Sequence, residues 1–386
     1  MRKILLVLMV LLGVELAFAQ QPEPTPTPVP DPDPLPGRPY EELVKLFDYP
    51  SEVPMNVWVG RPIAMGPTTE ESQLQFDEPL GGFPVVGLVI EPRRPHAQLP
   101  AVIFAEMGCW NRSLEPEFLS RLGAVAVNLQ SRCPAFHREP GRELLRDEAS
   151  EHHPTELIRR EVVALRRVYD YLVARGDVDP RRICVVGRNA TAVVAGIDRR
   201  FKCFVFREGQ LEPFIHPTHE PSPIELEKMG AWADDWNPYQ PVHYVGQIKA
   251  ASLFQVGIDV WNFFGSVAPE TRVVNDEDIA KSKEEGHAFY KAAGGRKRYR
   301  WYKPWSRDEN FKTLDSRTQY YRSYNLPVVT DAIRFLSAQL NLSAPTSWLC
   351  QYFSWPEVCR DPNEKSVSPG TTASGAPKPV SSIRKP

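Results

Sequence analysis

Acidic side chains and one histidine are the residues of this 386-residue chain with the clearest capacity for chemistry: Glu106, Asp259, Asp308, Glu309 and His137. Carboxylates with a histidine bind divalent cations, and they also bind cationic or hydroxyl-rich ligands. These residues are far apart in the sequence, so their spacing forms no metal-binding motif. The simpler interpretation is a set of solvated loop charges, and we expect no metal ion and no other cofactor.

Six cysteines could form disulfides or bind a metal: Cys109, Cys133, Cys184, Cys203, Cys350 and Cys359. Their spacings include no Cys-x-x-Cys, so a structural zinc site is not indicated. In an oxidising compartment we expect Cys350 to pair with Cys359 within one loop-like stretch. Cys109 and Cys133 would follow neighbouring strands and form a second pair, unless both stay buried thiols. Cys184 and Cys203 would lie mid-strand, where we expect them to pack in the core.

Short apolar segments that alternate with helical patterns must position these side chains. The expected strands are 85–90, 101–105, 124–129, 182–187, 203–206, 251–256 and 299–302. The expected helices are 118–122, 155–175, 190–197, 277–293 and 328–340. In the longest helix, apolar residues recur every three or four positions from Ile158 to Leu172, which is one helical face. Thr155 would cap its start, and Gly176 would end it.

This alternation predicts a doubly wound, mostly parallel sheet with helices on both faces. The run 101–105 is apolar without alternation, as in a strand that is buried on both faces. Functional sites in such sheets form at the carboxyl ends of the strands. We therefore expect the functional residues in the loops that follow Ala105, Leu129, Gly187, Val256 and Tyr302.

Two stretches carry a resemblance to a known family. A helix ending in Asp170-Tyr171-Leu172 leads through 177–181 into the strand 182–187, and Trp236-Asn237-Pro238 precedes a strand that runs to Asp259. Over roughly 80–340 the chain resembles the α/β-hydrolase superfamily, in its dienelactone-hydrolase and acetyl-esterase-like branch. The resemblance implies an α/β-hydrolase-like sheet, a short cap-like insertion at 207–245 and the hydrolysis of carboxylic esters.

The nucleophile of that family is replaced here. The family carries Gly-x-Ser-x-Gly at a tight strand-to-helix turn, whereas this chain reads Gly187-Arg188-Asn189-Ala190-Thr191 and contains no Gly-x-Ser-x-Gly. A carboxamide has no ionisable O–H or S–H to give up to a base, so Asn189 is not an activated nucleophile. Thr191 has a hydroxyl, but it lies two residues from the required position.

The other catalytic positions are altered too. Glu309 stands at the position of the family's histidine, and with an ordinary pKa near 4.3 it is a weak base at neutral pH. The oxyanion loop corresponds to Glu106, Met107 and Gly108, with Ala190 after the nucleophile position. A carboxylate at 106 would oppose a developing oxyanion. Asp259 alone keeps its type, at the position of the catalytic acid.

The two ends of the chain differ from this core. Residues 1–19 have a basic start, an apolar stretch and a small-x-small ending, which predicts a signal peptide. Proline occupies every second position from Pro22 to Pro36, so 20–37 would be an extended linker. The composition of 362–386 predicts a disordered tail, which leaves 38–361 as the folded domain. We expect a secreted, periplasmic or cell-envelope protein.

The overall composition limits the function. A formal charge of −2 with 42% hydrophobic residues fits a globular protein and argues against a nucleic-acid partner. We expect no membrane span once the signal peptide is removed, and a small-molecule ester or carbohydrate-like ligand. Three hypotheses remain: a degenerate hydrolase that acts by binding, an active esterase with an unconventional nucleophile or metal-activated water, and a structural module on a proline stalk.

Overall fold

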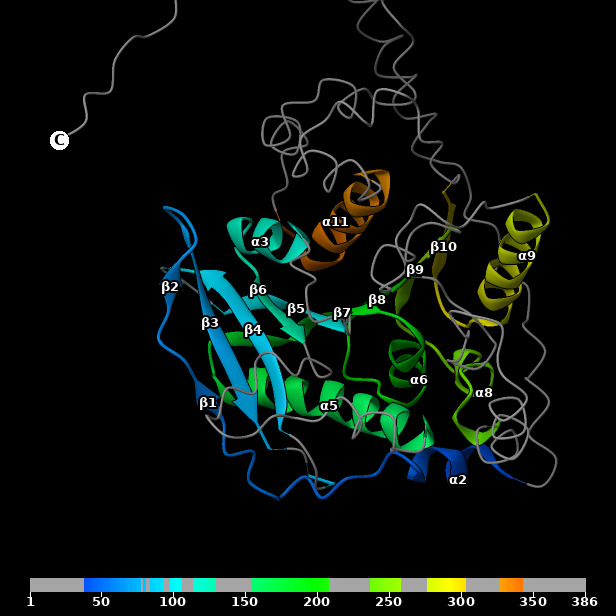
Figure 1. Cartoon of the computed structure of the whole chain (residues 1–386), viewed down its shortest axis with the longest axis horizontal. Helices are drawn as coiled ribbons and strands as arrows, with labels where there is room; N and C mark the ends of the chain where they lie inside the picture. Colours follow the sequence, from blue (N-terminus) through cyan, green and yellow to red (C-terminus); the bar gives the residue numbers. More distant parts are fainter. Residues whose placement is uncertain are drawn as a thin grey trace, which may run out of the picture. The chain divides into compact units, whose positions relative to one another are not determined.

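The computed structural model describes residues 38–77, 79–80, 84–93, 98–105, 114–129, 154–207, 237–257, 276–302 and 326–342. The chain divides into a unit ending at Ala344 and a second unit from Pro345, and the described residues all belong to the first. Within them the chain forms one ten-stranded sheet with helices packed on it (Figure 1).

The strands are β1 (Trp58–Val59), β2 (Ile63–Ala64), β3 (Thr69–Phe76), β4 (Val85–Pro92), β5 (Leu99–Ala105), β6 (Val125–Leu129), β7 (Val178–Gly187), β8 (Cys203–Arg207), β9 (Ala251–Val256) and β10 (Lys297–Trp301). The helices are α2 (Tyr40–Lys45), α3 (Leu114–Arg121), α5 (Pro154–Ala174), α6 (Asn189–Ile197), the 3₁₀-helix η2 (Asn237–Tyr239), α8 (Val242–Val245), α9 (Asp276–Ala292) and α11 (Leu326–Leu340).

The sheet is parallel over most of its width. Its order is β1-β3-β4-β6-β5-β7-β8-β9-β10, and β2 also pairs with β3. Six strands, β5 to β10, are mutually parallel. Strands β1, β2, β3 and β4 join them by antiparallel pairing. The predicted mostly parallel sheet is confirmed. The antiparallel end formed by β1, β2 and β3 was not predicted, and neither was α2.

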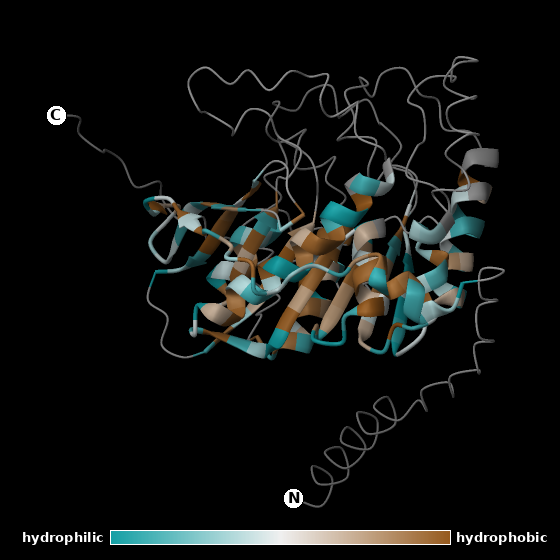
Figure 2. Ribbon diagram, turned by 90° about the horizontal axis from the view of Figure 1, so that it is seen from below, coloured by the Kyte–Doolittle hydropathy of each residue, from teal (hydrophilic) through white to brown (hydrophobic). Residues whose placement is uncertain are grey.

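Helices cover both faces of the sheet (Figure 1). Alternate residues of the buried strands point to opposite faces, so Val102 and Phe104 join one core with α3 and α11, while Ala101 and Ile103 join the other with α5 and α6. The central strands carry mostly hydrophobic residues (Figure 2). Both faces are therefore closed by apolar packing, as expected for a doubly wound sheet.

Helix α5 agrees with its sequence pattern except at its start. The stripe Ile158, Val162, Leu165, Tyr169 and Leu172 is buried throughout. The helix begins at Pro154, so Thr155 lies inside the first turn and is not the cap; proline suits the first helical position because its φ is already fixed near the helical value. Gly176 has φ +78°, which suits a glycine just beyond a helix end.

Two cysteines expected to be unpaired core residues form a disulfide. Cys184 in β7 and Cys203 in β8 stand directly opposite each other, with their Cα atoms 4.7 Å apart, and their sulfur atoms are bonded. The expectation of two separate buried thiols was wrong because that strand register brings both side chains together on one face. Cys109, Cys133, Cys350 and Cys359 lie outside the described residues.

The last part of the predicted insertion 207–245 packs into the body. Tyr244 and Val245 in α8 are fully buried in the core on the α5 side. Gly196 near the end of α6 allows this contact, because a methyl group there would lie 2.7 Å from Tyr244 Cβ. Residues 208–236 lie outside the described residues.

A Gly196→Ala substitution should therefore destabilise the protein. We expect the free energy of unfolding to fall by about 1–3 kcal/mol, because the added methyl overpacks the contact between α6 and α8. Gly66→Ala is the control, since its methyl would meet no atom nearer than 3.9 Å. Urea unfolding measures both; equal stability of the two variants would contradict this packing.

Candidate functional site at the carboxyl edge of the sheet

The parallel register brings four strand ends to one edge. Ala105 at the end of β5 pairs with Gly187 at the end of β7, Gly187 pairs with Phe206 of β8, and Phe206 pairs with Phe254 of β9. Of the loops expected to hold the site, only the turn after Gly187 is described from end to end. The geometry of the site is therefore built from that turn.

The turn after β7 is tight because of Gly187. A methyl group on Gly187 would collide with Thr191 Oγ1 and would lie 2.8 Å from Ala105 Cβ. Arg188 leaves the strand with φ −103° and ψ −143°, and α6 begins at the next residue, Asn189. The first hydrogen bond of the helix runs from Ala192 N to Arg188 O at 3.2 Å. Position 187 therefore needs a glycine for α6 to begin this close to the strand.

Two of the predicted site residues lie at this turn. Asn189 is the first residue of α6 and Ala190 the second, and Ala190 is buried. The first four N–H groups of a helix have no partner within it, so the backbone at this end can donate hydrogen bonds. The turn therefore offers donors at the carboxyl edge of the sheet.

The remaining predicted site residues lie outside the described residues: Glu106, Met107, Gly108, His137, Asp259, Asp308 and Glu309. Glu106 directly follows Ala105, and Asp259 comes two residues after the described Gly257. No group of metal-ligating side chains occurs within the part of the chain that the structure describes.

Thr191 does not offer its hydroxyl to a ligand. The residue is fully buried, and its Oγ1 atom finds no hydrogen-bond partner among the described residues. A nucleophile must be within reach of both a base and the substrate. Thr191 meets neither condition in this structure, so its hydroxyl serves packing against Gly187.

A buried ion pair at this edge was missed by the sequence reasoning. Arg207, the last residue of β8, pairs with Glu115 in the first turn of α3, and both side chains are buried. The signal in the sequence was Arg207 itself, a charged residue at the end of the otherwise apolar strand β8. The pair joins the beginning of α3, directly after 106–113, to the point where 208–236 begins.

A second buried polar group fixes α11 against the sheet. Gln255 of β9 donates from Nε2 to Tyr302 Oη at 2.9 Å and to the carbonyl oxygen of Val328 at 2.7 Å. Tyr302 in turn donates to Asp331 Oδ2 at 3.0 Å. Burial, and then the negative charge of Asp331, raise the pKa of Tyr302. The phenol therefore stays protonated near neutral pH and acts as a donor.

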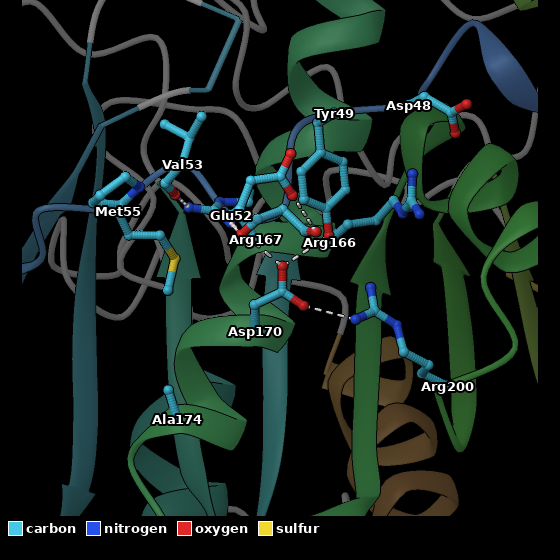
Figure 3. A pocket seen from close by; sticks show the side chains of 12 residues that line it. Asp48, Tyr49, Glu52, Val53, Met55, Arg166, Arg167, Asp170, Ala174 and Arg200 are labelled. Carbon is cyan, nitrogen blue, oxygen red and sulfur yellow. Dashed lines mark hydrogen bonds and ion pairs between the residues drawn. The ribbon is translucent and has the colours of Figure 1, made fainter.

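A hollow of about 560 Å³ lies elsewhere, between residues 48–55 and α5 (Figure 3). Asp170 accepts hydrogen bonds there from Tyr49 Oη at 2.7 Å and from Arg200 Nη1 at 2.6 Å. Arg200 stands between the end of α6 and the start of β8, which is the amino edge of the sheet. The hollow is thus not at the edge that holds Asn189.

The arginines of α5 use their donors to hold the chain itself. Arg166 donates to the carbonyl oxygen of Phe47 at 2.7 Å, and Arg167 donates to those of Ser51 at 3.0 Å and Val53 at 2.7 Å. Arg167 is 2% exposed. These contacts fasten residues 47–53 to α5, so we interpret the hollow as a structural junction.

Comparisons with known proteins identify the fold. No protein-family model and no curated protein matches the sequence. Among solved structures, acetyl xylan esterase from Paenibacillus sp. R4 is 16% identical, with a TM-score of 0.50, over 78% of this chain and 92% of that one. Acetyl xylan esterase 1 from Thermoanaerobacterium sp. JW/SL YS485 is 15% identical, with a TM-score of 0.46, over 78% and 95%. Glucuronoyl esterase from Solibacter usitatus is 13% identical, with a TM-score of 0.45, over 83% and 99%.

The Paenibacillus structure supports one conclusion: the chain has the α/β-hydrolase fold. At this identity the likeness concerns the arrangement of the sheet and helices. The predicted resemblance is confirmed at that level.

A Thr191→Val substitution tests the interpretation of the buried hydroxyl. Because Oγ1 has no partner among the described residues, we expect the free energy of unfolding to stay the same or to rise by up to about 1 kcal/mol. Chemical denaturation measures this. A loss of more than about 1 kcal/mol would mean that the hydroxyl makes a stabilising contact.

A Glu115→Gln substitution tests the buried ion pair. It leaves the buried Arg207 charge without its carboxylate, so we expect a loss of about 3–5 kcal/mol of stability. The matched control is Glu117→Gln, two residues along the same helix, where a partly exposed pair with Arg121 should be worth about 0.2–0.5 kcal/mol. Similar losses of stability in both variants would contradict the inference that burial makes the pair of Arg207 and Glu115 more important than the partly exposed pair.

Proposed function

We propose that this chain is an exported α/β-hydrolase-fold protein that has lost serine-type ester hydrolysis and acts by binding a small-molecule ester or carbohydrate-like ligand. One observation carries the proposal: Asn189 is the first residue of α6, at the strand-to-helix turn where the fold carries its nucleophile. The carboxamide supplies no nucleophile there.

The neighbouring hydroxyl does not compensate for this loss. Thr191 is the nearest alcohol in the turn, and it is fully buried against Gly187 and Ala105. An attacking oxygen needs access to substrate and a base within hydrogen-bond reach. The turn therefore keeps the shape of a catalytic elbow without a reactive group.

The expected partners of the nucleophile support the same proposal. Glu309 stands in the sequence where the family has its histidine, and Glu106 stands in the oxyanion loop. A carboxylate at either position disfavours the reaction, because it is a weak base near neutral pH and repels an oxyanion. Asp259 alone matches the family in type.

Export is part of the proposal and rests on the sequence. Residues 1–19 have the pattern of a signal peptide, and the proline-rich segment 20–37 follows. We place the working protein in the periplasm, the cell envelope or the medium. Among the described residues, no helix has the length and apolar character that crossing a membrane requires.

Ester hydrolysis by the purified chain tests the proposal. We expect no turnover of short-acyl p-nitrophenyl esters above the background, with or without chelator, from protein whose folding is verified by circular dichroism. An Asn189→Ala variant should behave identically. Turnover that disappears in Asn189→Ala would overturn the proposal and make the elbow functional.

Two other outcomes would favour the competing functions. Turnover that disappears only with chelator would indicate metal-activated water held by carboxylates such as Glu106 and Asp259. Absence of both turnover and any ligand-induced rise in melting temperature, across a panel of esters and sugars, would favour a structural module, because a ligand that binds the native state stabilises it.

A further inference from the structure

We propose that the antiparallel end of the sheet carries a binding surface for a neutral polysaccharide, formed by Trp58, Ile63, Gln73 and Gln75. We refer to these four residues as the tryptophan platform. The inference goes beyond the proposed function, since it assigns a second site on other elements. It does not depend on whether the turn at Asn189 is catalytic.

The platform is exposed in a way that is unusual for this chain. Trp58 in β1 is 53% exposed and Ile63 in β2 is 66% exposed. Trp58 is the single aromatic residue among the exposed large hydrophobic residues that the structure describes. An exposed tryptophan leaves a large apolar area in water, where the indole is available to pack against a ligand.

Strand pairing places the four side chains on one face. Trp58 pairs with Gln75 of β3, and Ile63 pairs with Glu71 of the same strand. Residues 71, 73 and 75 of one strand share a face, so Gln73 lies between Trp58 and Ile63. The two apolar side chains are thus about 13 Å apart along β3, at about 3.3 Å per residue.

The indole ring lies along the sheet. A methyl group on Gly60, two residues beyond Trp58 on the same face, would lie 3.1 Å from Trp58 Cη2 and 3.5 Å from Cζ3. The ring therefore extends over Gly60 along the direction of the strand. It rests on the backbone, and its outward side remains exposed to solvent.

The chemistry of the platform matches a neutral sugar chain. The C–H faces of a sugar ring can pack on an indole, and its hydroxyl groups can bond to amides, which donate and accept. Gln73 and Gln75 are both exposed, and their side-chain amides make no hydrogen bond to the described residues. None of the four platform side chains carries a charge, and Glu71, which shares their face, is buried, so the exposed surface complements an uncharged ligand.

The area and the edge argue against a second copy of the chain. Half of one tryptophan surface is roughly 100 Å², whereas a stable interface needs about 800 Å² from each partner. Strands β1 and β2 have two residues each, and Pro62 stands between them. So short an edge with a proline is a poor template for adding a strand.

The Trp58 end of the platform lies at the same edge of the sheet as the turn after Gly187, whereas Ile63 lies further towards the opposite edge. Gln75 pairs with Val86, and the next residue, Gly87, pairs with Leu129 at the carboxyl end of β6. Five interstrand steps separate β1 from β7, which is about 24 Å at about 4.8 Å per step. A polymer held at Trp58 could therefore extend towards Asn189.

Affinity electrophoresis of the full chain tests the platform, with soluble xylan, β-glucan and mannan as separate probes in the gel. We expect at least one of them to retard the wild type, and Trp58→Ala to weaken that binding about tenfold, through the lost apolar contact. Val59→Ala is the matched control. Val59 is the next residue of β1 and 46% exposed, but it pairs with Leu74 and so faces the other side.

A second variant tests the position of the ring. Gly60→Ala keeps every platform residue but forces the edge of the indole to shift by a few tenths of an ångström, so we expect it to weaken binding less than Trp58→Ala does. Equal thermal unfolding of all variants would show that the losses are not due to misfolding.

Three results would overturn the inference. One is no retardation of the wild type by any of the three polysaccharides, and another is equal loss in Trp58→Ala and Val59→Ala. The third is a concentration-dependent dimer that Trp58→Ala abolishes, which would make the surface an interface between copies. Ester turnover is measured separately, so failure of the platform leaves the test of Asn189 unaffected.

Discussion

The close approach at Gly187 is the constraint on which the candidate site depends. Ala105 from β5 and Thr191 from α6 fill the space that any side chain at this position would need. Both neighbours come this near just before α6 begins at Asn189, so position 187 has room only for a glycine. The turn is set by packing, and packing does not require a reactive residue. The shape of the turn is therefore compatible with an asparagine at position 189.

Buried polar contacts hold the surroundings of this turn in place. The pair of Arg207 and Glu115 joins β8 to α3, and Gln255 with Tyr302 joins β9 and the end of β10 to α11. Separating a buried charge from its partner costs free energy, so the ion pair holds the start of α3 against the end of β8. The described part of the edge is thus preformed, as ligand sites usually are.

The sequence predicted the central part of the fold and much less of the site. Runs such as 101–105 are apolar without interruption, so their burial in a parallel sheet could be read directly. Strand β3 was missed because its first half is Thr-Glu-Glu-Ser, and only its register with β4 makes it a strand. The disulfide between Cys184 and Cys203 also depends on register, which no spacing reveals. Asn189 could be found because the turn has a motif, whereas Arg207 and Glu115 are 92 residues apart and belong to no motif.

The antiparallel end of the sheet and the turn at Asn189 are positioned by different residues. The Trp58 end of the tryptophan platform and the turn lie on one edge, yet no residue is shared between them. Trp58 depends on Gly60 and β3 for its position, while Asn189 depends on Gly187 and β5. A substitution at Asn189 therefore should leave the tryptophan platform unchanged. A sugar chain bound at Trp58 would be held in a fixed position by the rigid sheet. Such binding requires no ester turnover.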